Sequence, residues 1–126
     1  MRTRPTRFGY RAIVLPEGVW DGDSATAKYI SLGLGVYLHG QKLRLFGINC
    51  PELRGATKVA GRAARDFVRE MLPDDGEVLI KTHKGRKKGK YGRWLAEIWI
   101  EKGPQQLVCV NDELLRAGHA VRYMDD

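Results

Sequence analysis

The chain has 126 residues, of which 43% are hydrophobic and 29% are charged, and this balance excludes an intrinsically disordered protein. The length leaves room for one hydrophobic core, so we expect a single domain over residues 1–126. No apolar run approaches the ~18 residues that cross a bilayer, which argues against a membrane protein. No apolar segment follows the first arginines, so we expect no signal peptide, and therefore an intracellular protein or the mature form of an exported one.

Positive charge is concentrated in one segment. Residues 81–93 contain seven basic side chains and no acidic one, whereas the remaining chain has 15 of each sign. Further arginines lie in residues 1–9, which we predict to form a flexible basic arm. Localised positive charge attracts phosphodiester backbones, so nucleic acid is favoured as a partner over a solvated loop that only aids solubility. Nothing indicates a protein partner, and we expect a monomer.

The expected elements are short strands and two helices. Apolar and β-branched residues predict strands at residues 10–15, 24–34, 42–48, 78–82, 94–100 and 107–110. In the third of these, Leu43 and Leu45 share one face, while Arg44 and Ile48 share the other. Before the second strand, Asp21 and Asp23 flank Gly22 in a tight turn, which we attribute to the positive φ that glycine tolerates.

Two helices complete this pattern. Apolar residues at three- and four-residue spacing predict a helix over residues 57–72, and Asn111 is the expected N-cap of a second, short helix. Five short strands with two to three helices outside them predict a mainly β, α+β fold, a five-stranded Greek-key barrel of the OB type. Cys50 and Cys109 are too few for a disulfide scaffold, and we expect free thiols.

Three polar segments stand in the same order and spacing as motifs of a known family. Residues 19–24 read VWDGDS, residues 44–52 read RLFGINCPE, and residues 89–93 read GKYGR. They resemble V-x-D-G-D-T, R-x-x-G-[IV]-D-x-P-E and D-K-Y-G-R of the staphylococcal nuclease (thermonuclease) family, whose fold is an OB barrel. Residues 110–120, VNDELLRAGHA, also resemble the family's V-N-x-x-L-V-x-x-G-L-A stretch.

The resemblance implies a calcium-dependent nuclease that cuts DNA and RNA with little sequence preference. Arg44 and Arg93 match the arginines that bind the scissile phosphate, and Glu52 matches the glutamate that activates or orients water. The implied metal-binding residues are Asp23, Asn49, Cys50 through its backbone carbonyl, and Asp21 in the outer shell. The segment before Arg93 implies nucleic-acid contacts from Lys84, Arg86, Lys87, Lys88, Lys90 and Tyr91.

The chemistry of phosphodiester cleavage supports these residue types independently. Negative charge gathers on the phosphoryl oxygens, so fixed positive charge and a positioned water serve the reaction better than covalent steps. Guanidinium groups present a planar fork to pairs of oxygens. A hard divalent cation held by oxygens adds Lewis-acid charge, and a nearby carboxylate can accept the proton of the water.

One substitution opens an alternative reading. Asn49 stands where the family has a metal-binding aspartate, so a full negative charge is missing and we expect weaker binding of calcium, with magnesium or manganese as other possible ions. The alternative is a non-catalytic OB module that binds single-stranded nucleic acid; a protein-interaction domain is a third option.

Two further features stay open. The hairpin between Asp23 and Arg44 is longer than in the family, with Tyr37 and His39 near its tip, and it is either a contact for nucleic acid or only a longer loop. Tyr123 lies near the family's substrate-lining tyrosines but not at a matching position.

Overall fold

The computed structural model describes residues 9–83 and 92–124. Within this part of the chain nine strands form: β1 (Gly9–Ile13), β2 (Val19–Asp21), β3 (Ser24–Gly33), β4 (Val36–Leu45), β5 (Ile48–Asn49), β6 (Glu77–His83), β7 (Trp94–Gly103), β8 (Gln106–Cys109) and β9 (Val121–Arg122). The same residues form two α-helices, α1 (Lys58–Met71) and α2 (Val110–Arg116), and two 3₁₀ turns, Pro16–Gly18 and Gly55–Thr57. The helix predicted over residues 57–72 is thus confirmed to within one residue at each end.

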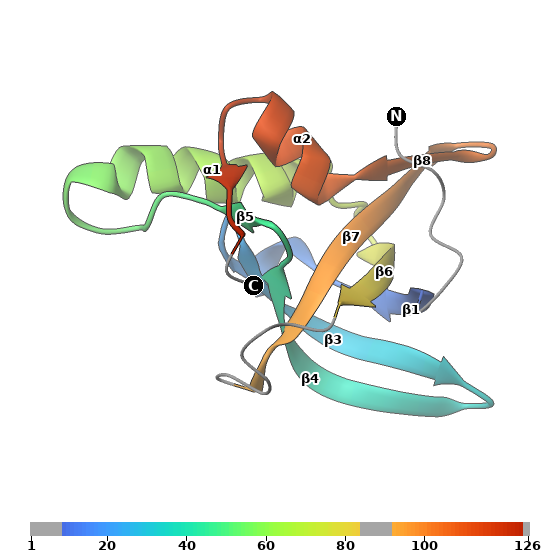
Figure 1. The fold of residues 1–126 in the computed structure, drawn as a ribbon. Coiled ribbons are helices and arrows are strands. Elements are labelled where there is room, and N and C mark those ends of the chain that lie inside the picture. The colour runs from blue at the N-terminus through green and yellow to red at the C-terminus, as the bar shows by residue number, and fades with distance from the viewer. Residues whose placement is uncertain (1–8, 84–91, 125–126) are drawn as a thin grey trace.

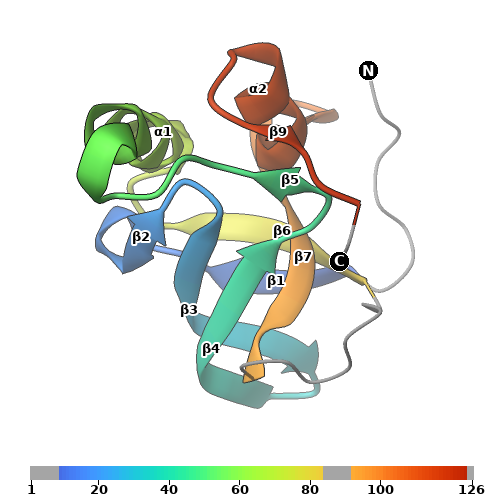
Figure 2. The ribbon, with the colours of Figure 1, turned by 60° about the vertical axis from the view of Figure 1, so that its left-hand side comes forward.

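Five strands are joined in a ring (Figure 2). β1 pairs antiparallel with β6, β6 antiparallel with β7, and β7 parallel with β4. The ring closes because β4 pairs antiparallel with β3, and β3 pairs with β1. The sheet-rich α+β architecture with two helices is therefore confirmed. The short strands β5 and β9 pair separately from this sheet.

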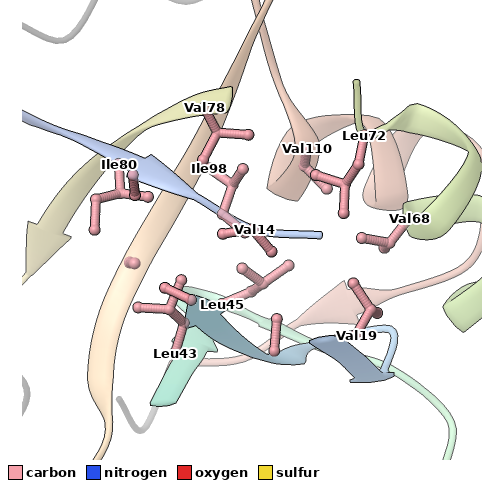
Figure 3. Packing of buried hydrophobic residues seen from close by; sticks show 14 of the residues in the cluster. Val14, Val19, Leu43, Leu45, Val68, Leu72, Val78, Ile80, Ile98 and Val110 are labelled. Carbon is pink, nitrogen blue, oxygen red and sulfur yellow. The ribbon is translucent and has the colours of Figure 1, made fainter. Parts of the chain in front are cut away.

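The core lies inside the ring and under the helices. Both α1 and α2 lie at one end of the strands in two views of the ribbon (Figures 1 and 2). Val68 and Leu72 of the α1 region face Val14, Leu45 and Val110 across this core (Figure 3). Each fully buried aliphatic side chain stabilises the fold by about 1.5–3 kcal/mol. The packed ring is therefore a rigid framework for the polar groups on its outer surface.

The β3–β4 hairpin extends away from the helices (Figure 1). Its turn has positive φ at Gly33, Leu34 and Gly35, and the expected long hairpin is confirmed. Tyr37 pairs in register with Ser31 close to this turn. The hairpin is therefore an extension of β3 and β4, which are two strands of the ring.

One strand predicted from alternation is wrong in its second half. The sequence pattern continues the strand through residue 48 and places Ile48 on the outer face with Arg44. Instead, β4 ends at Leu45, Gly47 has a φ of 78°, and Ile48 is 1% exposed. The left-handed conformation of Gly47 reverses the chain direction, so Ile48 returns to the core in β5.

Three other expectations concern single features. Cys50 and Cys109 are free, as expected. Gly9, which we assigned to the basic arm, is the first residue of β1, and the remainder of that arm lies outside the described residues. In the part of the chain that the structure covers, no helix is long and apolar enough to span a membrane.

Candidate active site

The acidic turn places Asp21 at the end of β2 and Asp23 directly before β3. Gly22 lies between them but is not among the described glycines with positive φ. A Cβ at this position would lie 2.8 Å from both the Ala64 Cβ and the Cys50 Sγ. The explanation drawn from the sequence was therefore wrong. Close packing of the turn against α1 and Cys50 requires the glycine, and this packing places the two carboxylates.

Arg44 of β4 is the centre of the site. It pairs with Ser24 in the β3–β4 register and is only 9% exposed. One guanidinium nitrogen lies 3.3 Å from Oδ2 of Asp23 and donates to the Leu45 carbonyl at 3.2 Å. The other terminal nitrogen donates to Oδ1 of Asn49 at 3.0 Å. These contacts fix the orientation of the planar guanidinium.

Tyr123 covers this guanidinium. Its ring centroid lies 5.5 Å from Cζ of Arg44, within the range of a cation–π contact. The backbone N–H of Tyr123 donates to the Gly47 carbonyl at 2.9 Å, next to the β5–β9 pairing. The sequence offered Tyr123 only as an off-register candidate; the structure brings it directly to Arg44.

The Asp23 carboxylate is 8% exposed and well supplied with donors. In addition to Arg44, its Oδ2 accepts the backbone N–H of Cys50 at 2.8 Å, and its Oδ1 accepts the Ser24 hydroxyl at 3.3 Å. These donors and the Arg44 guanidinium compensate for the hydration that the Asp23 side chain loses on burial. The contact of Cys50 with Asp23 is therefore made through the main chain.

The thiol of Cys50 is not suited to chemistry. Burial raises its pKa to about 12, and the negative charge of Asp23 acts in the same direction. Because the thiolate is the nucleophilic and metal-binding form, this side chain is neither a nucleophile nor a thiolate ligand near neutral pH.

Glu52 stands at the edge of the site with an anchored backbone and an exposed side chain. The Thr57 hydroxyl donates to the Glu52 carbonyl at 2.9 Å. A Cβ on Gly61 of α1 would lie 2.5 Å from that same carbonyl oxygen, so helix and loop are in close contact. The carboxylate itself is 71% exposed and lies 3.3 Å from Nε of Arg54.

The carboxylates share one local field. The pKa of Asp21 is raised above its ordinary value of 3.8, chiefly by burial and then by the charges of Asp23 and Glu52. Arg44 and Arg54 act in the opposite direction without overcoming this effect. Three acidic groups from two distant segments therefore lie near enough to influence one another through their charges.

Arg93 reaches the same region from the start of β7. It lines a pocket of about 270 Å³ together with Ser24 and Lys42. Ser24 links this pocket to the cluster because its hydroxyl donates to Asp23. The structure thus brings Arg44, Asp23 and Asn49 into direct contact. Glu52 is linked to them through its charge, which acts on Asp21, and Arg93 through the pocket that it shares with Ser24. The predicted nucleic-acid contacts lie outside the described residues: Lys84, Arg86, Lys87, Lys88, Lys90 and Tyr91.

Whether a metal ion fits near Arg44 depends on which atoms are available there as ligands. Among the described residues, no group of three His, Cys, Asp or Glu side chains is arranged to hold a metal. The side-chain oxygens that lie near Arg44 are the carboxylates of Asp21 and Asp23 and the amide of Asn49. Oxygen donors of this kind suit a hard divalent cation such as calcium. The Asn49 oxygen already accepts from Arg44, so the set fits calcium in type, with low ligand charge.

A buried polar network behind the site was not foreseen. Asn111, expected to be an N-cap, lies in the first turn of α2, and Cys109 takes the cap position. The Asn111 side chain donates to the carbonyls of Phe46 and Ala96 at 3.0 and 3.1 Å, and accepts from the Ile98 N–H at 3.2 Å. It therefore ties the end of β4, next to Arg44, to β7.

A second buried contact lies beside Phe46. His83 stacks on the Phe46 ring with centroids 3.8 Å apart and pairs with Glu97, a carboxylate that is 1% exposed. The Phe46 segment is thus supported from both β6 and β7.

With this geometry established, the comparison with protein families is decisive. Residues 42–126 match the model of the staphylococcal nuclease homologue family. The chain belongs to this family. Membership of this family indicates a nuclease-like function or another function related to nucleic acids. The match begins after the acidic turn, so Asp21 and Asp23 are supported by the contacts described above rather than by the family match.

One curated relative is an uncharacterized protein of Methanocaldococcus jannaschii, 28% identical over 104 residues. The aligned region covers 68% of this chain and 50% of that protein. The chain thus spans about half the length of the curated relative it matches.

Proposed function

We propose that this protein is a metal-dependent phosphodiesterase, an endonuclease that hydrolyses single-stranded DNA and RNA with little sequence specificity. One observation carries the proposal: Arg44 is buried and fixed between Asp23 and Asn49, next to the acidic turn on which the charge of Glu52 also acts. A fixed guanidinium beside carboxylates suits a reaction that needs both cationic and anionic groups.

We also propose that the strand ring is the OB-type Greek-key barrel of this family, in one monomeric domain without a membrane attachment. The ring of β1, β3, β4, β7 and β6 supports this assignment because its pairings return to the first strand. In the sequence, the basic segment that carries Lys84, Arg86, Lys87, Lys88, Lys90 and Tyr91 directly precedes Arg93, which suits a contact between this segment and nucleic acid.

In the proposed mechanism, Arg44 and Arg93 bind the non-bridging oxygens of the scissile phosphate and stabilise the charge that develops on them. Glu52 accepts the proton of the attacking water. Its exposed carboxylate can leave Arg54, because an exposed ion pair contributes only about 0–1 kcal/mol. Tyr123 keeps the Arg44 guanidinium in place through its ring contact.

Asp23, Asn49 and the carbonyl of Cys50 would hold the cation, with Asp21 in the outer shell. When bound, calcium would supply Lewis-acid charge to the phosphate. Asn49 would exchange its bond to Arg44 for the ion, and this exchange leaves Arg44 a free terminal nitrogen for phosphate. Magnesium or manganese could take the same oxygen donors.

A second candidate function is supported by the Arg44–Asn49 bond. Compared with an aspartate, the amide of Asn49 lacks one negative charge. Its oxygen already accepts a hydrogen bond from the Arg44 guanidinium at 3.0 Å. A cluster neutralised in this way can bind a phosphodiester without cutting it. The alternative is therefore an OB module that binds single-stranded nucleic acid.

A cleavage assay separates the two functions. Single-stranded DNA and RNA are incubated with the protein in calcium, with and without a chelator. We expect chelator-sensitive cutting that is lost in Glu52→Ala but retained in a control variant at an exposed acidic residue of another element, Glu101→Ala. Salt-sensitive binding of intact substrate, without cutting at millimolar calcium, would establish the binding module instead.

Asn49→Asp tests the proposed cation position. Calcium affinity follows the number of ligand charges, so the restored carboxylate should lower the calcium Kd by about tenfold or more, as measured by calorimetry. An unchanged calcium Kd would exclude Asn49 from the cation site.

A further inference from the structure

Trp20 is a rigid, exposed aromatic side chain beside the acidic turn, and it takes no part in the mechanism above. It directly precedes Asp21 and is 48% exposed. Its indole Nε1 donates to the Thr26 hydroxyl at 3.1 Å. The Lys42 ammonium lies 5.6 Å from the centroid of the ring. A large apolar ring held in this way at the surface is an available contact surface for a ligand.

The ring opens onto the pocket of about 270 Å³ that Arg93 also lines. Besides these two residues, the described lining consists of Ser24, Ala25, Lys42 and Leu43, and thus includes two cations and no carboxylate. An aromatic ring beside two cations is complementary to a base attached to an anionic backbone. The pocket therefore favours a nucleotide over a neutral or cationic ligand.

The pocket continues into the candidate active site. Ser24 lines it and donates its hydroxyl to Asp23. Lys42 and Arg44 alternate with buried Leu43 along β4, so their side chains leave the same face of the strand. Because two residues of a strand span about 6.6 Å, Lys42 lies about that distance along β4 from Arg44, the arginine that we propose binds the scissile phosphate.

We infer that Trp20 and Lys42 form a nucleotide subsite next to the cleavage position. One unpaired base of a single strand stacks on the Trp20 indole, and the Lys42 ammonium neutralises the phosphate of that nucleotide. The Lys42 side chain is flexible and exposed, so its amine can move from the ring to the phosphate as the base arrives. The inference rests on the proposed function, because it assumes that the strand also contacts Arg44.

Equilibrium binding in a chelator tests the subsite without cutting. Two probes of equal length are compared by fluorescence anisotropy: a single-stranded DNA with bases, and an abasic phosphodiester chain. Trp20→Ala should weaken binding of the first about 5- to 150-fold, the range expected for one base–aromatic stack, and leave the abasic probe unchanged. Trp20→Phe should retain most of the affinity, since a flat ring remains.

Lys42→Ala should behave differently, because it removes charge and not a stacking surface. It should weaken both probes alike and reduce the slope of log Kd against log salt concentration by about 0.7, the effect of one contact to a single strand. Trp20→Ala should leave this slope unchanged. In the cleavage assay, Trp20→Ala should raise KM with kcat retained, the mark of binding that is equal in ground and transition states.

Controls come from exposed residues elsewhere. Val59→Ala removes apolar surface from a residue of α1 that is 79% exposed, and Lys102→Ala removes a charge from the far end of β7; neither should alter binding. Equal weakening of both probes by Trp20→Ala, or no weakening, would overturn the subsite even while wild-type cleavage upholds the proposed function. A wild type that neither binds nor cuts would overturn both.

Discussion

The two sides of the candidate site are built in opposite ways. On one side Arg44 and Asp23 are 9% and 8% exposed, and both are held by several polar partners. On the other side the Glu52 carboxylate is 71% exposed and has one exposed partner, Arg54. Only the main chain of Glu52 is fixed, through Thr57 and the close approach of Gly61.

This contrast separates preorganisation from adaptability. Groups that stabilise developing charge are most effective when their orientation is set before the reaction, and Arg44 meets that condition. A group that accepts a proton from water needs reach, and its hydrogen bonds form when substrate is present. Under the proposed function, folding fixes the side that would bind the phosphate, and ligand binding would orient the Glu52 carboxylate.

The largest expected effect comes from removing the rigid side. Arg44→Ala should lower kcat/KM by about 10²–10³-fold, the cost of losing one fixed donor. It should also lower the free energy of unfolding by about 3–5 kcal/mol, because Asp23 loses its buried cation. Cleavage assays and chemical denaturation measure the two losses. Arg54→Ala, at an arginine with an 85% exposed side chain, is the control and should change stability little.

Glu52→Gln should alter activity alone. Loss of a general base lowers kcat by about 10²-fold or more, while substitution of an exposed side chain changes the free energy of unfolding by less than about 0.5 kcal/mol. Single-turnover rates and thermal melting are the measurements. A large fall in stability would contradict the division between the two sides.

Gly61→Ala tests the anchor of the Glu52 main chain. An alanine in a helix is ordinarily about 1 kcal/mol more favourable than glycine, but here the new Cβ would lie 2.5 Å from the Glu52 carbonyl oxygen. We expect destabilisation by about 1–3 kcal/mol, the usual cost of overpacking, together with lower kcat. Ala63→Gly, an exposed position of the same helix, should lower stability by about 1 kcal/mol without changing kcat. Stabilisation by Gly61→Ala would exclude a tight helix–loop contact.

The smallest effect concerns Asp21 and depends on pH. Burial and the charges of Asp23 and Glu52 raise its pKa above 3.8, so the folded state retains the proton more strongly than the unfolded state. The resulting stability is present below pH 3.8 and is lost as the pH rises through the raised pKa. Asp21→Asn should therefore melt at a higher temperature than wild type near neutral pH, and the difference should vanish at acidic pH. Added calcium should stabilise wild type more than this variant.

Much of this site follows from local sequence. The α1 helix has the spacing of an amphipathic helix and was predicted close to its observed bounds. The glycines near residue 34 also predicted a hairpin, but its second strand begins at Val36 and not at Lys42. These features depend on short-range periodicity and turn chemistry, which a single sequence carries. The proximity of Arg44 and Asp23 was instead implied by the family resemblance.

Features that depend on packing between distant segments were not predictable. Gly22 is required by Ala64 and Cys50, not by its own dihedral angles. Gly47 redirects Ile48 into the core, and Asn111 bonds to Phe46 and Ala96 instead of capping α2. The Gly22 and Asn111 contacts join elements far apart in the chain, for which no local pattern exists, and the return of Ile48 to the core depends on packing inside the ring.

The β5–β9 pairing has a consequence for protein synthesis. Tyr123 reaches the Arg44 guanidinium only through this late strand, and the two strands are separated by α1, β6, β7, β8 and α2. A nascent chain emerging from the ribosome therefore carries Arg44 long before it can cover that residue. The surface around Arg44 is therefore completed only once residues 121–123 have been made and β9 has paired with β5.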